Sequence, residues 1–144
     1  MPVQRPQPYL NCNFLVDFGN GSTAGFAEAT LPSIEIDVVS YREGSDKVNS
    51  VRQLPGLTRY GNLVLKRGIV GDLDLFNWIR AVSNGQLDRR NVSVTLLDEQ
   101  RNAVQRWSVR NAFPVKYEGA HLKAKASEVA IELLELACDG LEIE

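Results

Sequence analysis

The feature that most constrains the fold is a two-residue alternation of apolar side chains near the start of the chain. From Leu10 to Phe18 every even position is apolar, whereas the odd positions are mostly polar. Successive side chains of a β-strand point to opposite faces, so this period predicts a strand with one buried face. Cys12 falls on the apolar phase, and we therefore expect it to be a small buried side chain.

Further strands are expected along the first half of the chain. The segment 24–31 reads as a strand that Pro32 ends, and the stretch Gly19 to Ser22 before it has the composition of a turn. The segment 58–66 reads as another strand.

The segment 34–41 between these two also has the strand period. Here Ile34, Ile36 and Val38 are expected to point inward, with Glu35 and Asp37 outward.

A long polar connection separates the last two of these strands. Residues 42–55 are polar apart from Val48, Val51 and Leu54, which are spaced three apart. Ordered loops of this length in compact domains usually carry function. We expect residues 43–54, with Arg52 among them, to form a subunit interface that is mobile in the free chain and ordered on assembly.

One helix is predicted, over residues 73–84. Asp72 is expected to be its N-cap, and Gly85 suits the C′ position after its end. Leu75, Ile79 and Val82 form an apolar stripe with Phe76 beside it, and Trp78 lies off that stripe.

The second half of the chain returns to strands. Residues 92–96 alternate in polarity, 98–102 is expected to be a turn, and 107–113 to be the return strand, which Pro114 interrupts. Residues 127–139 fit either a helix, because four acidic residues have helical spacing, or a strand whose phase slips at Leu134. The periodicity slightly favours the helix.

Some apolar residues fall on the strand phases that would be wet in a monomer. Four of them, on three strands, are Leu15, Val39, Tyr41 and Leu97. Their number indicates that neighbouring copies cover the second face of the sheet, which adds these residues to the expected interface.

Catalytic and ligand-binding chemistry has no support in the sequence. There is one histidine, His121, and the two cysteines are far apart, so no metal-ligand spacing occurs, and we expect neither cofactor nor metal. Asp72 and Asp74 are better explained by helix capping than as an acid–base pair. The pairs Lys66–Arg67 and Arg89–Arg90 are interpreted as solvated charges. The net charge of −2 gives no sign of direct nucleic-acid binding. No apolar run is long enough to cross a membrane.

The block PGLTRYGNLVLKRGIVGDLDLFNWI, Pro55 to Ile79, resembles the signature of the tail tube proteins of contractile phages and bacterial contractile injection systems. Members carry a G-x-x-K/R-Y-x-x-L/I-x-L-K-R-G strand followed by an acidic-capped helix with an F-x-x-W element. The matching residues are Gly56, Arg59, Tyr60, Leu63, Leu65, Lys66, Arg67, Gly68, Phe76 and Trp78, with F-x-W spacing in this chain. The strand around Phe14 and the ending ELACDGLEIE are also similar, so the resemblance covers nearly the whole chain.

The resemblance implies a single domain over residues 1–144, a mainly β sandwich or barrel with one flanking helix, in which residues 127–139 form a strand. It also implies an extended hairpin or loop that reaches neighbouring subunits, and assembly of the chain as stacked hexameric rings into a hollow, non-enzymatic conduit. Sheath, baseplate and spike proteins would be its partners, with protein or DNA as cargo. The chain itself would be made in the bacterial cytoplasm and would not insert into a membrane.

Two questions stay open at this point. The particle could be a phage tail or a bacterially encoded injection system, and we favour the second. The alternative from another class is a monomeric β-sandwich binding module with a ligand loop at residues 42–55.

Overall fold

The computed structural model describes residues 2–19 and 23–144. The expected turn from Gly19 to Ser22 therefore lies largely outside the described residues. Within them the chain forms ten strands and one helix: β1 (Phe14–Asp17), β2 (Thr23–Ala24), β3 (Glu28–Thr30), β4 (Ile34–Tyr41), β5 (Arg52–Tyr60), β6 (Leu63–Gly68), α1 (Asp74–Ser83), β7 (Arg90–Leu97), β8 (Ala103–Glu118), β9 (Ile131–Ala137) and β10 (Gly140–Ile143). The mainly β fold with one helix is confirmed for this part of the chain.

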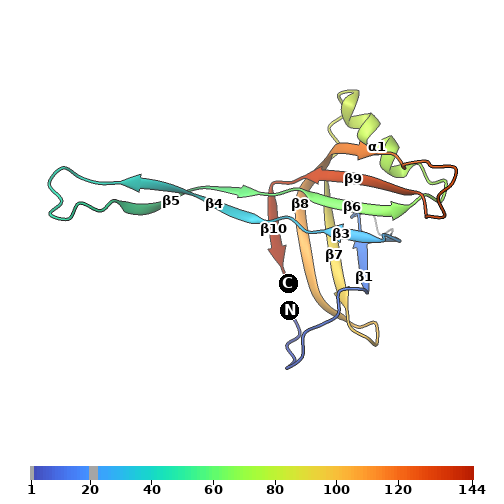
Figure 1. Cartoon of the computed structure of the whole chain (residues 1–144), viewed down its shortest axis with the longest axis horizontal. Helices are drawn as coiled ribbons and strands as arrows, with labels where there is room; N and C mark the ends of the chain where they lie inside the picture. The colour runs from blue at the N-terminus through green and yellow to red at the C-terminus, as the bar shows by residue number, and fades with distance from the viewer. Residues whose placement is uncertain (1, 20–22) are drawn as a thin grey trace.

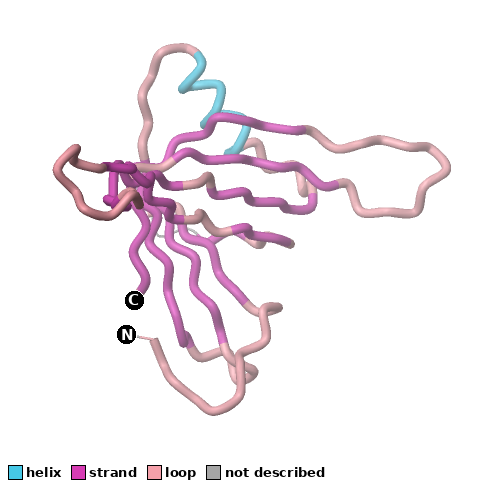
Figure 2. Tube along the Cα trace, turned by 60° about the vertical axis from the view of Figure 1, so that its left-hand side comes forward, coloured by secondary structure: helices cyan, strands magenta, loops and turns pink. Residues whose placement is uncertain are grey.

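Eight of these strands form two antiparallel layers that share β8. The first half of β8 pairs with β7 and β10, and β7 continues through β1 to β2; we call this layer sheet A. The second half of β8 pairs with β9, and β9 continues through β6 to β3, which we call sheet B. Figure 2 shows the two groups of strands diverging from a common corner at a large angle. Over the described residues the sheets do not close into a complete barrel.

Strand β8 changes direction between its two halves. Asn111 lies there with a φ of 51°, a conformation that Asn tolerates better than most residues. Its backbone N–H donates to Oδ1 of Asn91, 3.1 Å away, which fixes the corner. Figure 1 shows β8 as one long curved strand. The sequence predicts that Pro114 interrupts this strand, but the structure shows no break there. Pro114 lies within β8 at a register shift opposite β9, where a proline is tolerated.

The core lies between the two sheets and is closed by α1. Leu63, Leu65, Leu134 and Leu136 from sheet B are fully buried against Val16, Val92 and Val109 from sheet A. The even-numbered residues of β9 point inward without any slip at Leu134. The strand expected from the family resemblance is therefore confirmed, and the helical interpretation of residues 127–139 is wrong.

Trp78, which the sequence pattern places off the apolar stripe, is one of the buried anchors of α1. Its exposed fraction is 2%, its ring meets the ring of Phe18 edge-on at 5.8 Å, and its indole N–H donates to the Asp88 carbonyl at 2.8 Å. The buried stripe thus runs through Leu75 and Trp78 toward Val82, whereas Phe76 is 43% exposed. The helix is rotated because the core offers Trp78 both a ring contact and a hydrogen-bond acceptor.

The ends of α1 confirm one expectation and correct another. Gly85 follows the last turn with a φ of 90°, as its C′ position requires. The N-cap residue is Leu73, not Asp72, and it makes no side-chain capping bond. Asp72 lies one residue earlier, and its carboxylate accepts the Asp74 N–H at 3.1 Å.

A buried ionic network joins α1 to sheet B. Arg67 is 3% exposed. Its Nε donates to the Glu132 carboxylate at 2.6 Å, and its Nη2 donates to the Asp74 carboxylate at 2.6 Å. The second oxygen of Glu132 accepts the Tyr117 hydroxyl at 2.6 Å, and this hydrogen bond raises the pKa of Tyr117. The interpretation of Arg67 as a solvated charge is wrong, because the odd phase of β6 points into the core. Lys66, on the even phase, remains on the surface.

The early strands are shorter than their patterns predict. β1 begins at Phe14, and Leu10 and Cys12 are exposed, because β7 ends at Leu97 and offers no partner beyond the bond from Leu97 N–H to the Asn13 carbonyl. The expected strand 24–31 appears as β2 and β3.

The expected strand 58–66 is also divided, between the end of β5 and β6, because a break after Tyr60 separates them.

We expect the replacement of Arg67 by Met to lower the free energy of unfolding by about 3–5 kcal/mol, because Glu132 would be left buried without its cation. The double variant Arg67→Met, Glu132→Leu should recover much of that loss, since it removes the second charge as well. Urea unfolding followed by tryptophan fluorescence measures both. A single variant within about 0.5 kcal/mol of the wild type would contradict a structural role for the pair.

Candidate subunit interfaces

Strands β4 and β5 form a hairpin that leaves the body of the molecule. β3 pairs with β6 and β4 pairs with β5, so the hairpin prolongs the edge of sheet B outward. Figure 1 shows it projecting far from the other elements. At its base the Gly61 N–H donates to the Ser33 carbonyl at 2.8 Å, and a Cβ at Gly61 would lie 2.8 Å from Oγ of Ser33. Glycine there lets the two strands approach closely.

One face of the hairpin exposes the apolar residues that the sequence pattern places inward. Ile34, Ile36 and Val38 are 51%, 56% and 66% exposed. The strand and its alternation are as expected, but the inward assignment is wrong because within the described chain no second layer packs on this ribbon. A row of large aliphatic side chains in water is unfavourable by roughly 1.5–3 kcal/mol for each residue relative to full burial.

The opposite face carries a second apolar cluster near the tip. Val39 lies directly across from Leu54, and Tyr41 across from Arg52, whose guanidinium lies 5.5 Å from the centre of the Tyr41 ring. Val39, Tyr41 and Leu54 are 50%, 45% and 43% exposed. The structure thus brings together four residues that the sequence assigns to an interface, from both sides of the connection.

The tip itself is shorter than expected, because β5 begins at Arg52 and only residues 42–51 connect the strands. The Arg42 side chain donates to the carbonyl oxygens of Asp46 and Val48, both at 3.1 Å. Asp46 accepts the Glu43 N–H at 3.0 Å and lies 3.6 Å from the Arg52 guanidinium. Val48 and Val51 remain exposed on this closed turn. The sequence-predicted mobility of the segment in a free subunit stays a prediction.

The two remaining expected interface residues, both on sheet A, behave differently. Leu15 is 45% exposed, as expected. Leu97 is 7% exposed, so its outward assignment is wrong. The register between β7 and β8 shifts between Leu96 and Leu97, which changes the phase of the last residue of β7.

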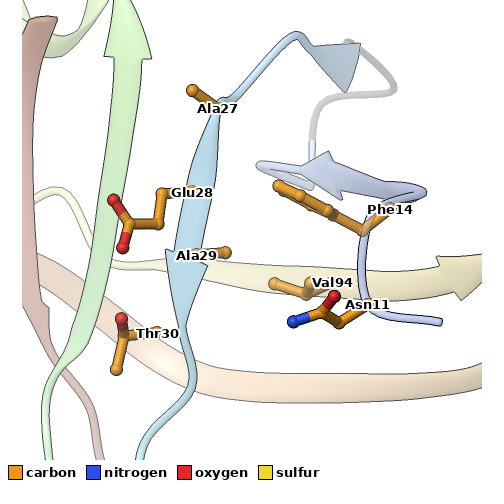
Figure 3. A pocket seen from close by; sticks show the side chains of 7 residues that line it. All are labelled: Asn11, Phe14, Ala27, Glu28, Ala29, Thr30 and Val94. Carbon is orange, nitrogen blue, oxygen red and sulfur yellow. The ribbon is translucent and has the colours of Figure 1, made fainter.

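Sheet B ends in two strand edges that no other described strand pairs. On one side β3 pairs only with β6, and on the other side residues 113–118 of β8 pair only with β9. Figure 3 shows the gap between β3 and β1, with Phe14 and Ala29 pointing toward one another across it and Glu28 and Thr30 pointing the other way. The groove there has a volume of about 320 Å³. Unpaired edges present free backbone N–H and C=O groups to another chain. Sequence reasoning missed both edges, because pairing partners are not visible in a single strand's pattern.

The described residues give little support for a metal site, a membrane span or a reactive cysteine. Among them, no three His, Cys, Asp or Glu side chains gather as metal ligands would. The helix, with ten residues, falls short of what crossing a membrane needs. Cys138 is half-buried, its thiol donates to the Gly61 carbonyl at 3.5 Å, and burial raises its pKa.

Comparison with known proteins gives a consistent result. The family model described as T4-like virus tail tube protein gp19 matches residues 10–142. The fold is similar to a chain in the extended PVC sheath–tube complex of an extracellular contractile injection system, with a TM-score of 0.87, 23% identity and coverage of 96% of this chain and 93% of that one.

Two further solved structures are also similar in fold to this chain. A chain in the baseplate structure of the anti-feeding prophage has a TM-score of 0.83 and 26% identity, over 97% of each chain. Hcp1 from Flavobacterium johnsoniae has a TM-score of 0.57 and 15% identity, over 90% of this chain and 93% of that one. No protein of curated function matches significantly.

We expect serine at Val48, Val51 and Leu54 together to leave a folded, soluble chain that no longer builds tubes, because these exposed residues make no core contact in the monomer. Size-exclusion chromatography with light scattering measures the association, and circular dichroism reports the fold. The matched control is Val48→Ile, Val51→Ile, Leu54→Met, which keeps the surface apolar and should still associate. Normal assembly of the serine variant would show that the hairpin tip is no interface.

Proposed function

The chain belongs to the T4-like virus tail tube protein family, and on that premise we propose that it builds the inner tube of a contractile particle as stacked hexameric rings. Its role in the family is structural. The observation that carries the finer proposal is the pair of unpaired edges of sheet B, together with a hairpin that exposes apolar residues on both faces.

The two edges support assembly into a ring. They belong to different strands, β3 and β8, so an edge-to-edge contact between copies is heterologous and uses a different surface on each partner. A heterologous contact generates a closed ring when its rotation closes, and an open filament otherwise. Pairing β3 of one copy with residues 113–118 of the next satisfies both free edges and leaves none in the completed ring.

The hairpin supports stacking of one ring on the next. It extends well beyond the body that would make the ring, so it reaches outside its own subunit (Figure 1). An isolated two-stranded hairpin is at best marginally stable in water, and burying its exposed aliphatic residues against another copy offsets that weakness. We infer that Val39, Tyr41, Arg52 and Leu54, with Val48 and Val51 at the tip and Leu15 on the body, lie at contacts between copies.

Partners and particle type follow from the same premise. The similar structures include a sheath–tube complex and a baseplate, and we propose that this chain also meets sheath, baseplate and spike proteins. These neighbours come from contractile injection systems, which supports such a particle over a phage tail, with protein more than DNA as cargo. The alternative of a monomeric binding module is set aside, because family membership accounts for the whole domain.

The direct test of the proposal is self-assembly of the purified chain without any cofactor. We expect negative-stain electron microscopy at high protein concentration to show rings and stacked tubes with a central hole. A chain that stays strictly monomeric, even with its sheath and baseplate proteins present, would overturn the proposal.

A substitution at the β3 edge tests the ring contact separately. The Ile69 N–H donates to the Ala130 carbonyl, so the odd residues of β6 face β9 and the even ones face β3. Lys66 and Val64 pair with Glu28 and Thr30, which leaves the Ala29 N–H between them at the free edge of β3. Ala29→Pro removes that donor and should give a folded chain that forms no rings, whereas Ala29→Ser, which keeps the N–H, should assemble normally. Analytical ultracentrifugation distinguishes the two, and equal assembly of both variants would exclude an edge-to-edge contact at β3.

A further inference from the structure

The two faces of sheet B are unlike one another. One face is covered by sheet A and α1 of the same chain, and carries Leu63, Leu65, Leu134 and the buried Arg67. On the other face Lys66, Lys116 and Glu118 have side chains that are 40%, 53% and 53% exposed, so no described element covers it. A role for this uncovered face rests on the proposed ring assembly.

The geometry of a ring decides which way the uncovered face points. When identical sheets join edge to edge and close, the side that carries additional layers needs the larger circumference. Sheet A and α1 therefore lie outside, and the uncovered face of sheet B lines the central hole. The strand registers then identify the side chains that line the wall of the conduit.

Two rows of side chains cross this face. The first row runs Glu28, Lys66, Leu133 and Glu118, which are successive partners across β3, β6, β9 and β8. The second row runs Thr30, Val64, Glu135 and Lys116 on the same strands. Figure 3 shows Glu28 and Thr30 on the side of β3 away from Ala29, whose side chain packs on the core.

The charges on this face are largely paired within one subunit. The Lys66 ammonium lies 3.6 Å from the Glu28 carboxylate, and the Lys116 ammonium 2.9 Å from that of Glu118. The Glu135 carboxylate accepts a hydrogen bond from the Asn62 amide at 3.0 Å. Glu135 lies opposite Lys116 in the register, but Lys116 already pairs with Glu118. Three carboxylates on this face thus share two ammonium groups, so each copy carries one negative charge in excess.

We propose that this face makes the conduit wall selective for protein cargo with a positively charged surface, and that Glu135 supplies the excess negative charge. One uncompensated carboxylate from each copy forms a ring of like charge in a narrow hole, where walls of low dielectric constant focus the field. Nucleic acid binding depends on free Lys and Arg that displace counterions, and this wall has its cations already paired. Val64 and Leu133 add apolar contact area between the charges.

The test uses assembled tubes of the full chain and two fluorescent probes of opposite charge, a ten-residue oligolysine peptide and a ten-nucleotide single-stranded DNA. Tubes are assembled with either probe, external probe is digested with trypsin or a nuclease, and retained fluorescence is measured after pelleting. We expect wild-type tubes to retain at least about tenfold more peptide than DNA, in a salt-sensitive manner. Glu135→Lys should reverse that preference.

A matched control makes the same charge change elsewhere. Glu128 is exposed on the connection between β8 and β9, and Glu128→Lys should leave the retention ratio within about twofold of the wild type. If Glu135→Lys prevents assembly, Glu135→Gln removes the excess charge without reversing it and should lower peptide retention by roughly threefold.

The outcomes separate the two proposals. Wild-type tubes that retain both probes equally, or Glu135 and Glu128 variants that shift retention alike, would overturn the assignment of the wall while the tube function stands. Failure of the wild-type chain to form tubes would overturn the proposed function and, with it, this inference.

Discussion

The proposed assembly depends on one constraint of the subunit, which is that the described strands leave backbone hydrogen-bonding groups unpaired at the two edges of sheet B. Strand β8 gives its first half to sheet A and its second half to sheet B, so each half has a different set of partners. The division creates the core, because the two sheets pack against one another from a shared corner at Asn111. It also leaves residues 113–118 and β3 without a second strand partner among the residues that the structure describes. The same corner that makes a stable subunit therefore makes an incomplete sheet, which the proposed ring of copies completes.

The buried pair of Arg67 and Glu132 holds the covered side of this sheet to α1. Arg67 reaches both the carboxylate of β9 and that of Asp74 at the start of the helix, while Tyr117 of β8 occupies the remaining oxygen of Glu132. Three strands and the helix are thus fixed by one set of charge-assisted bonds. A buried pair of this kind is weak evidence for added stability, but removing one member is costly. Its directional bonds set the position of the helix on the covered side, while the uncovered face stays regular.

Much of the fold could be predicted from the sequence, and the failures have physical causes. The bounds of β4 follow from alternation alone, and the end of α1 follows from Gly85. The burial of Cys12, the outward position of Leu97 and the surface position of Arg67 were wrong. Each depends on a partner distant in sequence: the end of β7, the register between β7 and β8, and Glu132. The prediction that Trp78 lies off the buried stripe was wrong for a similar reason, since the Asp88 carbonyl and Phe18 determine which face of the helix turns inward. For the candidate interface, the alternation of side chains within each strand identifies the exposed apolar residues. The free edges of sheet B are visible only once the pairing between strands is known.

The hairpin shows why alternation succeeds for the strand and fails for its environment. In β4 the residues Ile34, Ile36 and Val38 obey the pattern of a half-buried strand, and the pattern is sound evidence that something covers them. The described part of a single chain provides no such cover, which supports the proposal that the covering surface belongs to another copy. The opposite face is interrupted at its base by the ion pair of Asp37 and Arg59, whose atoms lie 2.9 Å apart. Charges on a projecting ribbon oppose indiscriminate pairing with other edges. The apolar cluster is thereby confined to the distal half of that face, so the contact it favours is one that the hairpin reaches with its tip.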